Sequence, residues 1–403
     1  MSRREIRFRP PALELGPAVR WMLLRAFAPA GAAAPAVDAA AALAVCRRFD
    51  LACRVAARQG RPRLAAELGA AAAEGLARDR AAAVAGGLRL MALAGQVAAV
   101  AAPRDLPLVF LKFAALELGG ALVPGSRTAC DLDVLVPAGR AVELRDALAA
   151  AGFRASSMPA QEHQLAALEG PGGVVEVHCK MLGVRVAGRR SATAEDLASQ
   201  GLLAALPALP GRAAVPVPAV AAAHALVHGI AQHGWTPHAY SPFKMLADLV
   251  DLGFGAPGDG AALLRSIAAW TARDVAAAEV EAVRRLCAAL AAGGDLDGWQ
   301  RSPAGEAVLL RHALAGRLDP EYERSLRLSQ FRRQPSDRPE AARLARSVAA
   351  TLWLSRAQVD AIYGPPRHRL AYFGRQLGRP LDLLARLGRY GLHAWRLRRR
   401  RSA

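Results

Sequence analysis

The chain has 403 residues, which is enough for two or three domains and excludes a small fold held together only by disulfides or metals. Hydrophobic residues make up 53% and charged residues 22%, a globular composition that excludes a largely disordered chain. With 53 basic and 34 acidic residues the net charge is +19, which favours anionic partners such as phosphates, nucleic acids or membrane surfaces.

The basic excess gathers at both ends of the chain, within residues 3–9 and 396–401. Neither tail interleaves aromatic residues, so we expect solvated tails, and no motif indicates contact with nucleic acid. Five scattered cysteines without a C-x-x-C pair fit a reducing compartment, and we expect a cytoplasmic protein without a secretory signal. The longest apolar run, residues 90–103, is shorter than the ~20 residues a bilayer requires, so no transmembrane segment is predicted.

Three short segments have the features of β-strands and follow a helical region. From residue 35 to 103, Ala and Leu recur at helical spacing. Residues 106–111, 131–136 and 173–178 are short apolar runs with β-branched side chains, which predict strands. Helices are predicted between them at 114–122 and 142–151. This alternation predicts a small α/β unit between about 104 and 182.

The second half of the chain is predicted to be helical. Helical spacing recurs over residues 218–253, 260–292, 305–315, 339–354 and 381–395, and the polar segment 330–339 with two prolines is the best linker. The predicted class is therefore α+β and mostly helical, with a small mixed sheet. The predicted domains are an N-terminal helical segment at 1–103, an α/β core at 104–212, a helical domain packing on the active site at 213–330, and C-terminal helices with a basic tail at 331–403.

Carboxylates share one face of two of these strands. Because side chains alternate along a strand, Asp131 and Asp133 lie on one face, and Glu176 and His178 share a face of the third strand. Burying carboxylates side by side is unfavourable unless a cation neutralises them. If the two strands are neighbours, three carboxylates converge on one point and form a site of the type that Mg²⁺ prefers. The alternative is that Asp131 and Asp133 begin a strand at a solvated edge.

Two basic residues accompany these carboxylates. Lys112 ends the first predicted strand with its ammonium group free, and Arg127 lies just before the second strand. We predict that both contact phosphate oxygens, Arg127 more strongly because its planar guanidinium can engage a phosphate through two donors. The alternative for each is a surface salt bridge.

Three histidines follow in the helical half. His224 and His228 are four residues apart, which places them on one helical face at a spacing that suits zinc. On an ideal α-helix, His233 lies elsewhere on the helical wheel. Without a third ligand on that face, we prefer the interpretation that the helices from 228 to 248 pack beside the α/β unit. In that interpretation His228, His233 and Asp248 shape its cleft.

Several motifs recur in a fixed order along the chain. In that order they are Phe110-Leu111-Lys112, Ala115-Leu116, Arg127-x-x-x-Asp131-Leu132-Asp133-Val134-Leu135-Val136, Gly152-Phe153, Val175-Glu176-Val177-His178, His228-Gly229, His233-x-Trp235 and Lys244-Met245-Leu246-Ala247-Asp248-Leu249. This pattern resembles the uncharacterised nucleotidyltransferase family of the DNA polymerase β-like nucleotidyltransferase superfamily. Tyr363, Pro365 and Arg379-Pro380-Leu381 are similar to its weaker C-terminal pattern, so the resemblance extends over about residues 45 to 390.

The resemblance implies transfer of a nucleotidyl group from a nucleoside triphosphate to an acceptor hydroxyl with Mg²⁺ or Mn²⁺. In a two-metal scheme the catalytic residues and metal ligands are Asp131, Asp133 and Glu176. The residues we assign to nucleotide binding are Lys112, Ser126, Arg127 and His178. The acceptor is an unidentified small molecule or peptide.

One residue departs from the family pattern. Phe113 stands where the family has glycine, whose lack of a side chain lets a backbone amide approach a phosphate closely. Two alternatives therefore stay open, because a fold does not fix its function. One is phosphoryl- or glycosyl-type tailoring of a small-molecule or peptide natural product. The other is a non-catalytic binding or scaffold protein, which Phe113 favours.

Overall fold

The computed structural model describes residues 15–156, 160–233, 241–255, 267, 269–271, 275, 277–294, 305–318, 373–375, 377–378 and 388. The two basic tails, the predicted linker at 330–339, the predicted helix at 339–354 and all but one residue of that at 381–395 lie outside this part of the chain. The same is true of Trp235 and of the C-terminal motif residues Tyr363, Pro365 and 379–381.

The N-terminal region is helical, as predicted. It contains α1 (Pro17–Phe27), α2 (Ala39–Arg48), α3 (Ala52–Gln59) and α4 (Arg61–Leu68), followed by the long helix α5 (Ala70–Ala101). Gly60 and Gly69 have φ angles of +73° and +82°, and they separate α3 from α4 and α4 from α5. Glycine takes such a conformation without the strain a side chain would cause, so these two positions fix where the helices break.

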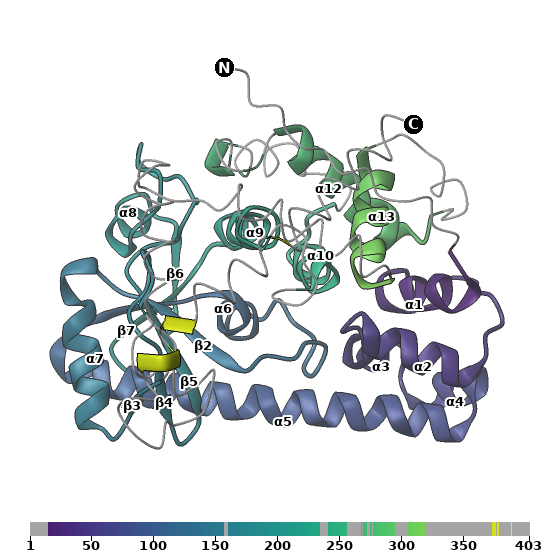
Figure 1. Ribbon diagram of the computed structural model, residues 1–403, viewed down its shortest axis with the longest axis horizontal. Helices are drawn as coiled ribbons and strands as arrows, with labels where there is room; N and C mark the ends of the chain where they lie inside the picture. Colours follow the sequence, from purple (N-terminus) through teal and green to yellow (C-terminus); the bar gives the residue numbers. More distant parts are fainter. Residues whose placement is uncertain are drawn as a thin grey trace.

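Helix α5 connects the N-terminal helices to the sheet. Its 32 residues span about 48 Å at 1.5 Å per residue, and Figure 1 shows it running along one edge of the molecule from α4 to the strands. Its first half packs against α3 and α4, and its second half packs against the sheet through residues such as Leu93 and Val97. Among the described residues, the segment Ala70–Arg104 is the one helix that is long and apolar enough to cross a membrane, which is weak evidence because a core helix passes the same test. Contacts with partners at both ends are typical of a core helix.

A mixed sheet of seven strands lies beyond the end of α5, after the single turn η1 (Ala102–Arg104). The spatial order is β3-β4-β5-β2-β1-β7-β6. The parallel pairs are β2 with β5 and β1 with β7, and the other neighbours are antiparallel. In chain order the strands are β1 (Pro107–Phe110), β2 (Asp131–Leu135), β3 (Arg154–Ala155), β4 (Leu168–Gly170), β5 (Gly173–His178), β6 (Leu203–Ala205) and β7 (Arg212–Pro216).

The two faces of the sheet differ in chemistry. Leu132 and Val134 of β2 and Val175 and Val177 of β5 join a buried apolar cluster with α5 and α7 (Ala141–Ala150), which follows the turn η2 (Ala138–Arg140). The alternate residues of the same strands carry the carboxylates. The described helices that follow β7 are α9 (Pro218–Leu226), η3 (Val227–Gln232), α10 (Pro242–Asp251), α12 (Ala277–Ala292) and α13 (Gly305–Leu318). Figure 1 shows α5 on one side of the strands and α9 and α10 on the other.

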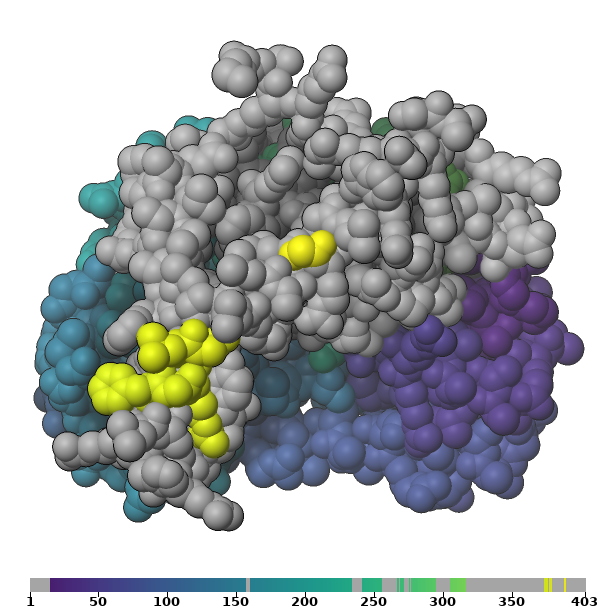
Figure 2. Space-filling model, in the orientation of Figure 1, coloured from purple at the N-terminus to yellow at the C-terminus, as the bar shows by residue number. Residues whose placement is uncertain are grey.

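The C-terminal helices return to the beginning of the chain. Helix α12 contacts α1 as well as α10 and α13, and all of them share the larger hydrophobic core with β-strand residues such as Leu135. In Figure 2 the N-terminal helices and the sheet region lie at opposite ends of α5, with a hollow between them above this helix. The sheet thus lies between the N-terminal and C-terminal helical parts along the chain, but in space these two parts contact each other through α1 and α12.

The three predicted strands are confirmed to within one residue at each end, as β1, β2 and β5. Four further strands were not predicted, because they are short or rich in alanine, which has low strand propensity. The helix predicted at 114–122 is α6 (Lys112–Leu118), which starts directly after β1, and α8 (Ala194–Ser199) adds a short helix with a Thr193 capping box. The division of the chain into four domains stays a prediction.

Candidate functional site

Asp133 and Glu176 lie side by side on adjacent parallel strands. The register of β2 and β5 pairs Asp133 with Glu176 and Leu135 with His178. The ligand atoms of Asp133, Glu176 and His178 all lie within 4.8 Å of one another, and all three side chains are buried. The predicted convergence of Asp133 and Glu176 is therefore confirmed in geometry, and His178 is part of the same cluster.

Lys112 places a positive charge against this cluster. Its Nζ lies 2.7 Å from Asp133 Oδ1 and 4.0 Å from Glu176 Oε2. The backbone of Lys112 has φ +49°, a left-handed conformation that is uncommon for a residue with a side chain, and Lys112 is the first residue of α6. The sequence interpretation left this ammonium group free for a phosphate, whereas in the structure it pairs with Asp133.

His178 contacts the same two carboxylates. Its Nε2 lies 2.8 Å from Asp133 Oδ1 and 3.6 Å from Glu176 Oε2. The ring of His163 lies 5.4 Å from the His178 ring, centroid to centroid. His163 was not singled out from the sequence, because the segment that precedes β4 carries no motif.

The charges in this cluster shift one another's pKa. Burial opposes ionisation of Asp133, but Lys112 and His178 outweigh it and hold the pKa of its carboxyl well below the usual value. Burial likewise opposes protonation of Lys112 and His178, but the carboxylates raise the pKa of both groups. The cluster is thus a buried set of opposite charges that neutralise one another.

Asp131 lies at the rim of this cluster, two residues before Asp133 in β2. Its side chain is half-buried, and its pKa is raised by burial and by the negative charge of Asp133. The thiol of Cys130 lies 3.6 Å from Asp131 Oδ1. Asp131 shares the face of Asp133, as predicted, but it does not belong to the three-residue group.

The cluster fits a divalent metal ion. Within the described part of the chain, Asp133, Glu176 and His178 form the one group of three metal-ligating side chains. Two adjacent buried carboxylates are stabilised in their ionised form by a positive charge, and carboxylate oxygens are the ligands that Mg²⁺ and Mn²⁺ take.

Arg127 makes a buried ion pair instead of projecting into open solvent. Its Nε lies 2.8 Å from Asp248 Oδ1 of α10, and its guanidinium lies over the ring of Phe113, 5.5 Å from the centroid. The neighbouring residue Ser126 is buried, and its hydroxyl has no hydrogen-bond partner among the described residues. The loop before β2 is therefore attached to α10 through Arg127, next to a buried hydroxyl.

The predicted cleft between the sheet and the helices contains a small cavity. Its volume is about 20 Å³, and it is lined by Lys112 together with His224, His228 and Asp248, among others. His228 and Asp248 therefore lie beside the α/β unit, as predicted.

The position predicted for His233 is wrong. The helix is wound as a π-helix over Val227–Gln232, and the His233 amide donates to the His228 carbonyl. Because a π-turn places residues five apart above one another, the rings of His228 and His233 meet, with their Nε2 atoms 3.1 Å apart. An ideal α-helical wheel would have separated them, and no sequence signal indicated the extra residue in the turn. His228 Nδ1 also lies 2.6 Å from Gln232 Oε1.

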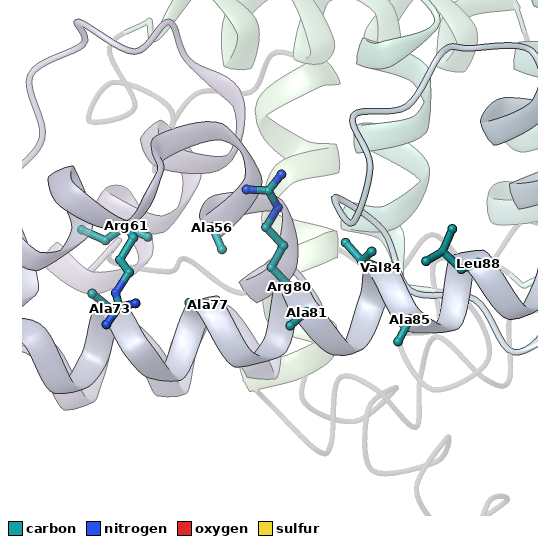
Figure 3. Close-up of a pocket in the computed structure, with 10 residues that line it drawn as sticks. Ala56, Arg61, Ala73, Ala77, Arg80, Ala81, Val84, Ala85 and Leu88 are labelled. Atoms are coloured by element: carbon teal, nitrogen blue, oxygen red, sulfur yellow. The ribbon is translucent and has the colours of Figure 1, made fainter.

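A larger cavity of about 480 Å³ lies along α5 (Figure 3) and has a different character. Half of its lining residues are alanines of α3 and α5, and the rest are Val84, Leu88 and Arg80 of α5 with Arg61 and Leu64 of α4. It contains no acid, base or nucleophile that could act on a phosphate ester.

One comparison with known proteins identifies a family. The sequence model of a family described as uncharacterised nucleotidyltransferase matches residues 35–288, which is more than half of the chain and includes the sheet, the buried cluster and α10. No curated protein and no solved structure matches the chain.

Proposed function

The chain belongs to the uncharacterised nucleotidyltransferase family, and from this membership we propose that it transfers a nucleotidyl group from a nucleoside triphosphate to an acceptor hydroxyl, with Mg²⁺ or Mn²⁺. The observation that carries the proposal is the pairing of Asp133 with Glu176 across two parallel strands. These residues belong to the two motifs on which the resemblance rests. Their carboxylates are buried and adjacent, which is the arrangement that divalent-ion chemistry at a phosphate requires.

The residues that would hold the ion are Asp131, Asp133 and Glu176. A divalent ion there would polarise the phosphate oxygens and make the acceptor hydroxyl easier to deprotonate. Asp131 is the most exposed of the three carboxylates, so it is the one that faces an incoming ligand. The other two are held in place by the sheet and by their contacts with Lys112 and His178.

The triphosphate would be bound by groups around this carboxylate face. Lys112 carries a positive charge at the cluster, and Ser126 offers a buried hydroxyl. Arg127 is adjacent to Ser126 and would exchange its partner Asp248 for a phosphate oxygen. In the metal-free protein His178 holds Asp133 in position. The helices that carry His228, His233 and Asp248 border the face and would shape the cleft.

Phe113 does not occupy the carboxylate face. Its ring is buried in the apolar cluster on the other side of the sheet, within contact distance of the position a side chain at Gly87 would take. The side chain at this position therefore packs toward α5 and under Arg127, which supports a catalytic protein over a scaffold.

The test is pyrophosphate release from each of the four nucleoside triphosphates, with Mg²⁺ or Mn²⁺ and a cell extract as the source of acceptor. We expect release with at least one triphosphate, incorporation of its α-phosphate label into a product, and loss of both with Asp131→Asn. A protein that binds no Mg²⁺-triphosphate in calorimetry would contradict the proposal and support the scaffold alternative. Transfer of the γ-phosphate label instead would support phosphoryl tailoring.

A further inference from the structure

Lys112 and His178 share one oxygen atom of Asp133. The ammonium Nζ of Lys112 lies 2.7 Å from Asp133 Oδ1, and Nε2 of His178 lies 2.8 Å from the same atom. A carboxylate oxygen accepts through two lone pairs, so both acceptor sites of Oδ1 are engaged by these two groups. Oδ1 of Asp133 is thus already engaged by two groups of the protein itself.

The same ammonium group compensates the second carboxylate. Lys112 Nζ is 4.0 Å from Glu176 Oε2, so the ammonium group is close to both buried carboxylates and attracted by both. A divalent ion bound by Asp133, Glu176 and His178 would lie within a few ångströms of this ammonium group. Two cations at that separation in a buried site repel each other, so the ion and the ammonium group compete for the same carboxylates.

His178 also bears on which ion fits. The group that converges within 4.8 Å contains one imidazole and two carboxylates, while Asp131 lies outside it. Imidazole nitrogen suits first-row transition ions, whereas Mg²⁺ prefers oxygen ligands and retains several waters. A site in which His178 adds a nitrogen donor to the carboxylate oxygens proposed above therefore favours Mn²⁺ or a similar ion over Mg²⁺.

A small cavity beside Lys112 can receive its ammonium group when this group leaves the carboxylates. Its side chain lines the cavity of about 20 Å³ that also borders His224, His228 and Asp248. Its Cα is fixed at the first residue of α6, so a rotation of the four-carbon stem moves the ammonium without moving the helix.

We infer that Lys112 is the counter-ion of the metal-free site, and that a transition ion with His178 as its nitrogen ligand displaces it and frees its ammonium for an anionic ligand. This inference deepens the proposed function, on which the identity of that anionic ligand as a triphosphate rests. Metal binding and triphosphate binding are then coupled through one side chain, so each strengthens the other.

The first test is a titration of the full chain with Mn²⁺ alone, followed by EPR of the free ion. Lys112→Met removes the competing cation, and we expect it to bind Mn²⁺ roughly 5- to 150-fold more tightly than the parent, the usual range of such couplings. The matched control is Lys180→Met, since Lys180 is the other lysine near β5 and pairs with Glu162 at 3.4 Å instead of with the cluster. We expect no change for this control. An unchanged or weaker Mn²⁺ affinity in folded Lys112→Met overturns the competition.

The second test uses the parent protein and so does not depend on how Lys112→Met folds. Pulsed EPR of bound Mn²⁺ is expected to show modulation from one directly coordinated histidine nitrogen. This modulation disappears in His178→Gln and persists in His163→Gln, whose ring lies beside that of His178. Competition with Mg²⁺ should show the preference for Mn²⁺ decreasing at least about tenfold in His178→Gln.

Mn²⁺ that binds without nitrogen modulation overturns the assignment of His178, and absence of Mn²⁺ binding overturns the whole inference. Neither result depends on turnover. Pyrophosphate release by a protein that fails these tests leaves the proposed function standing, and nitrogen-ligated Mn²⁺ in a protein without nucleotide turnover leaves the site standing.

Discussion

Arg127 and Asp248 form a buried ion pair that joins the loop before β2 to helix α10. The two side chains are 9% and 3% exposed, and their Nε and Oδ1 atoms are 2.8 Å apart. Loss of one partner of such a pair leaves the other charge buried and uncompensated, which costs about 3–5 kcal/mol. This pair therefore couples the α/β core to the helices that face it.

We predict that Arg127→Ala and Asp248→Ala each lower the free energy of unfolding by about 3–5 kcal/mol, and that the double variant is less destabilised than the sum of the two. Urea denaturation of the four proteins gives this coupling. The exposed pair Arg47 and Asp79 is the matched control, for which the same cycle should give about 1 kcal/mol or less. Additive effects at Arg127 and Asp248 would show that their charges do not interact in solution.

Replacing either aspartate of β2 should abolish turnover, but only the replacement of Asp133 should lower the stability strongly. Asp133→Asn breaks the contact with Lys112 and leaves its charge under-compensated, so we expect a loss of about 3–5 kcal/mol of folding free energy. Burial and the charge of Asp133 already disfavour the ionised form of Asp131. The Asp131→Asn variant should therefore differ from the parent by about 0.5 kcal/mol or less in free energy of unfolding. Both variants should lose turnover. A stable and fully active Asp131→Asn would remove that residue from the site.

Phe113→Gly, which restores the residue that the family has, should weaken the protein and not improve its activity. The ring is buried in the apolar cluster, and the guanidinium of Arg127 lies over its face. Its removal leaves a cavity, which should lower the free energy of unfolding by about 3–5 kcal/mol. Phe113→Leu keeps most of the volume and is expected to lose about 1.5 kcal/mol or less. Thermal unfolding and nucleotide affinity measured on both variants check this. Tighter triphosphate binding by folded Phe113→Gly would show that the ring obstructs the ligand.

Acid should destabilise the protein below the ordinary pKa of histidine. Burial lowers the pKa of His224 from 6.5 to about 3 and that of His233 to about 4. The unfolded chain therefore binds more protons than the folded one below about pH 6.5, and stability falls as the pH decreases toward 4 by about 1.4 kcal/mol per unit for each such group. In His224→Gln the loss of unfolding free energy between pH 7.5 and 5 should be about 2 kcal/mol smaller than in the parent. Parallel pH profiles for the two proteins would mean that folding does not lower the pKa of His224.

The strands that carry the carboxylates were predictable, because period-two alternation depends only on neighbouring residues. Asp133 and Glu176 followed from that alternation together with the assumption that their strands are adjacent, which the register of β2 and β5 confirms. The match over residues 35–288 likewise confirms the family that the motifs indicated.

What the sequence did not predict depends on contacts between distant segments. The partners of Lys112 and Arg127 come from β2 and α10, 21 and 121 residues further along the chain, and no local pattern specifies such a pair. The ring contact of His228 with His233 depends on a π-turn, which ideal helical geometry does not anticipate. The strands β6 and β7 are rich in alanine, so the pairing of β7 with β1 and of β6 with β7, and not their composition, makes them strands.

Helix α5 has a consequence for how the molecule unfolds. One half of it completes the core around α3 and α4, and the other half completes the core beneath the sheet. Extending an existing α-helix is far more favourable than nucleating a new one, so the two halves of α5 form together. Unfolding of one half therefore weakens the packing of the other half against its own core. The N-terminal helices and the sheet should therefore melt together in a single cooperative transition, and a proteolytic nick in the middle of α5 should release both at once instead of yielding two stable fragments.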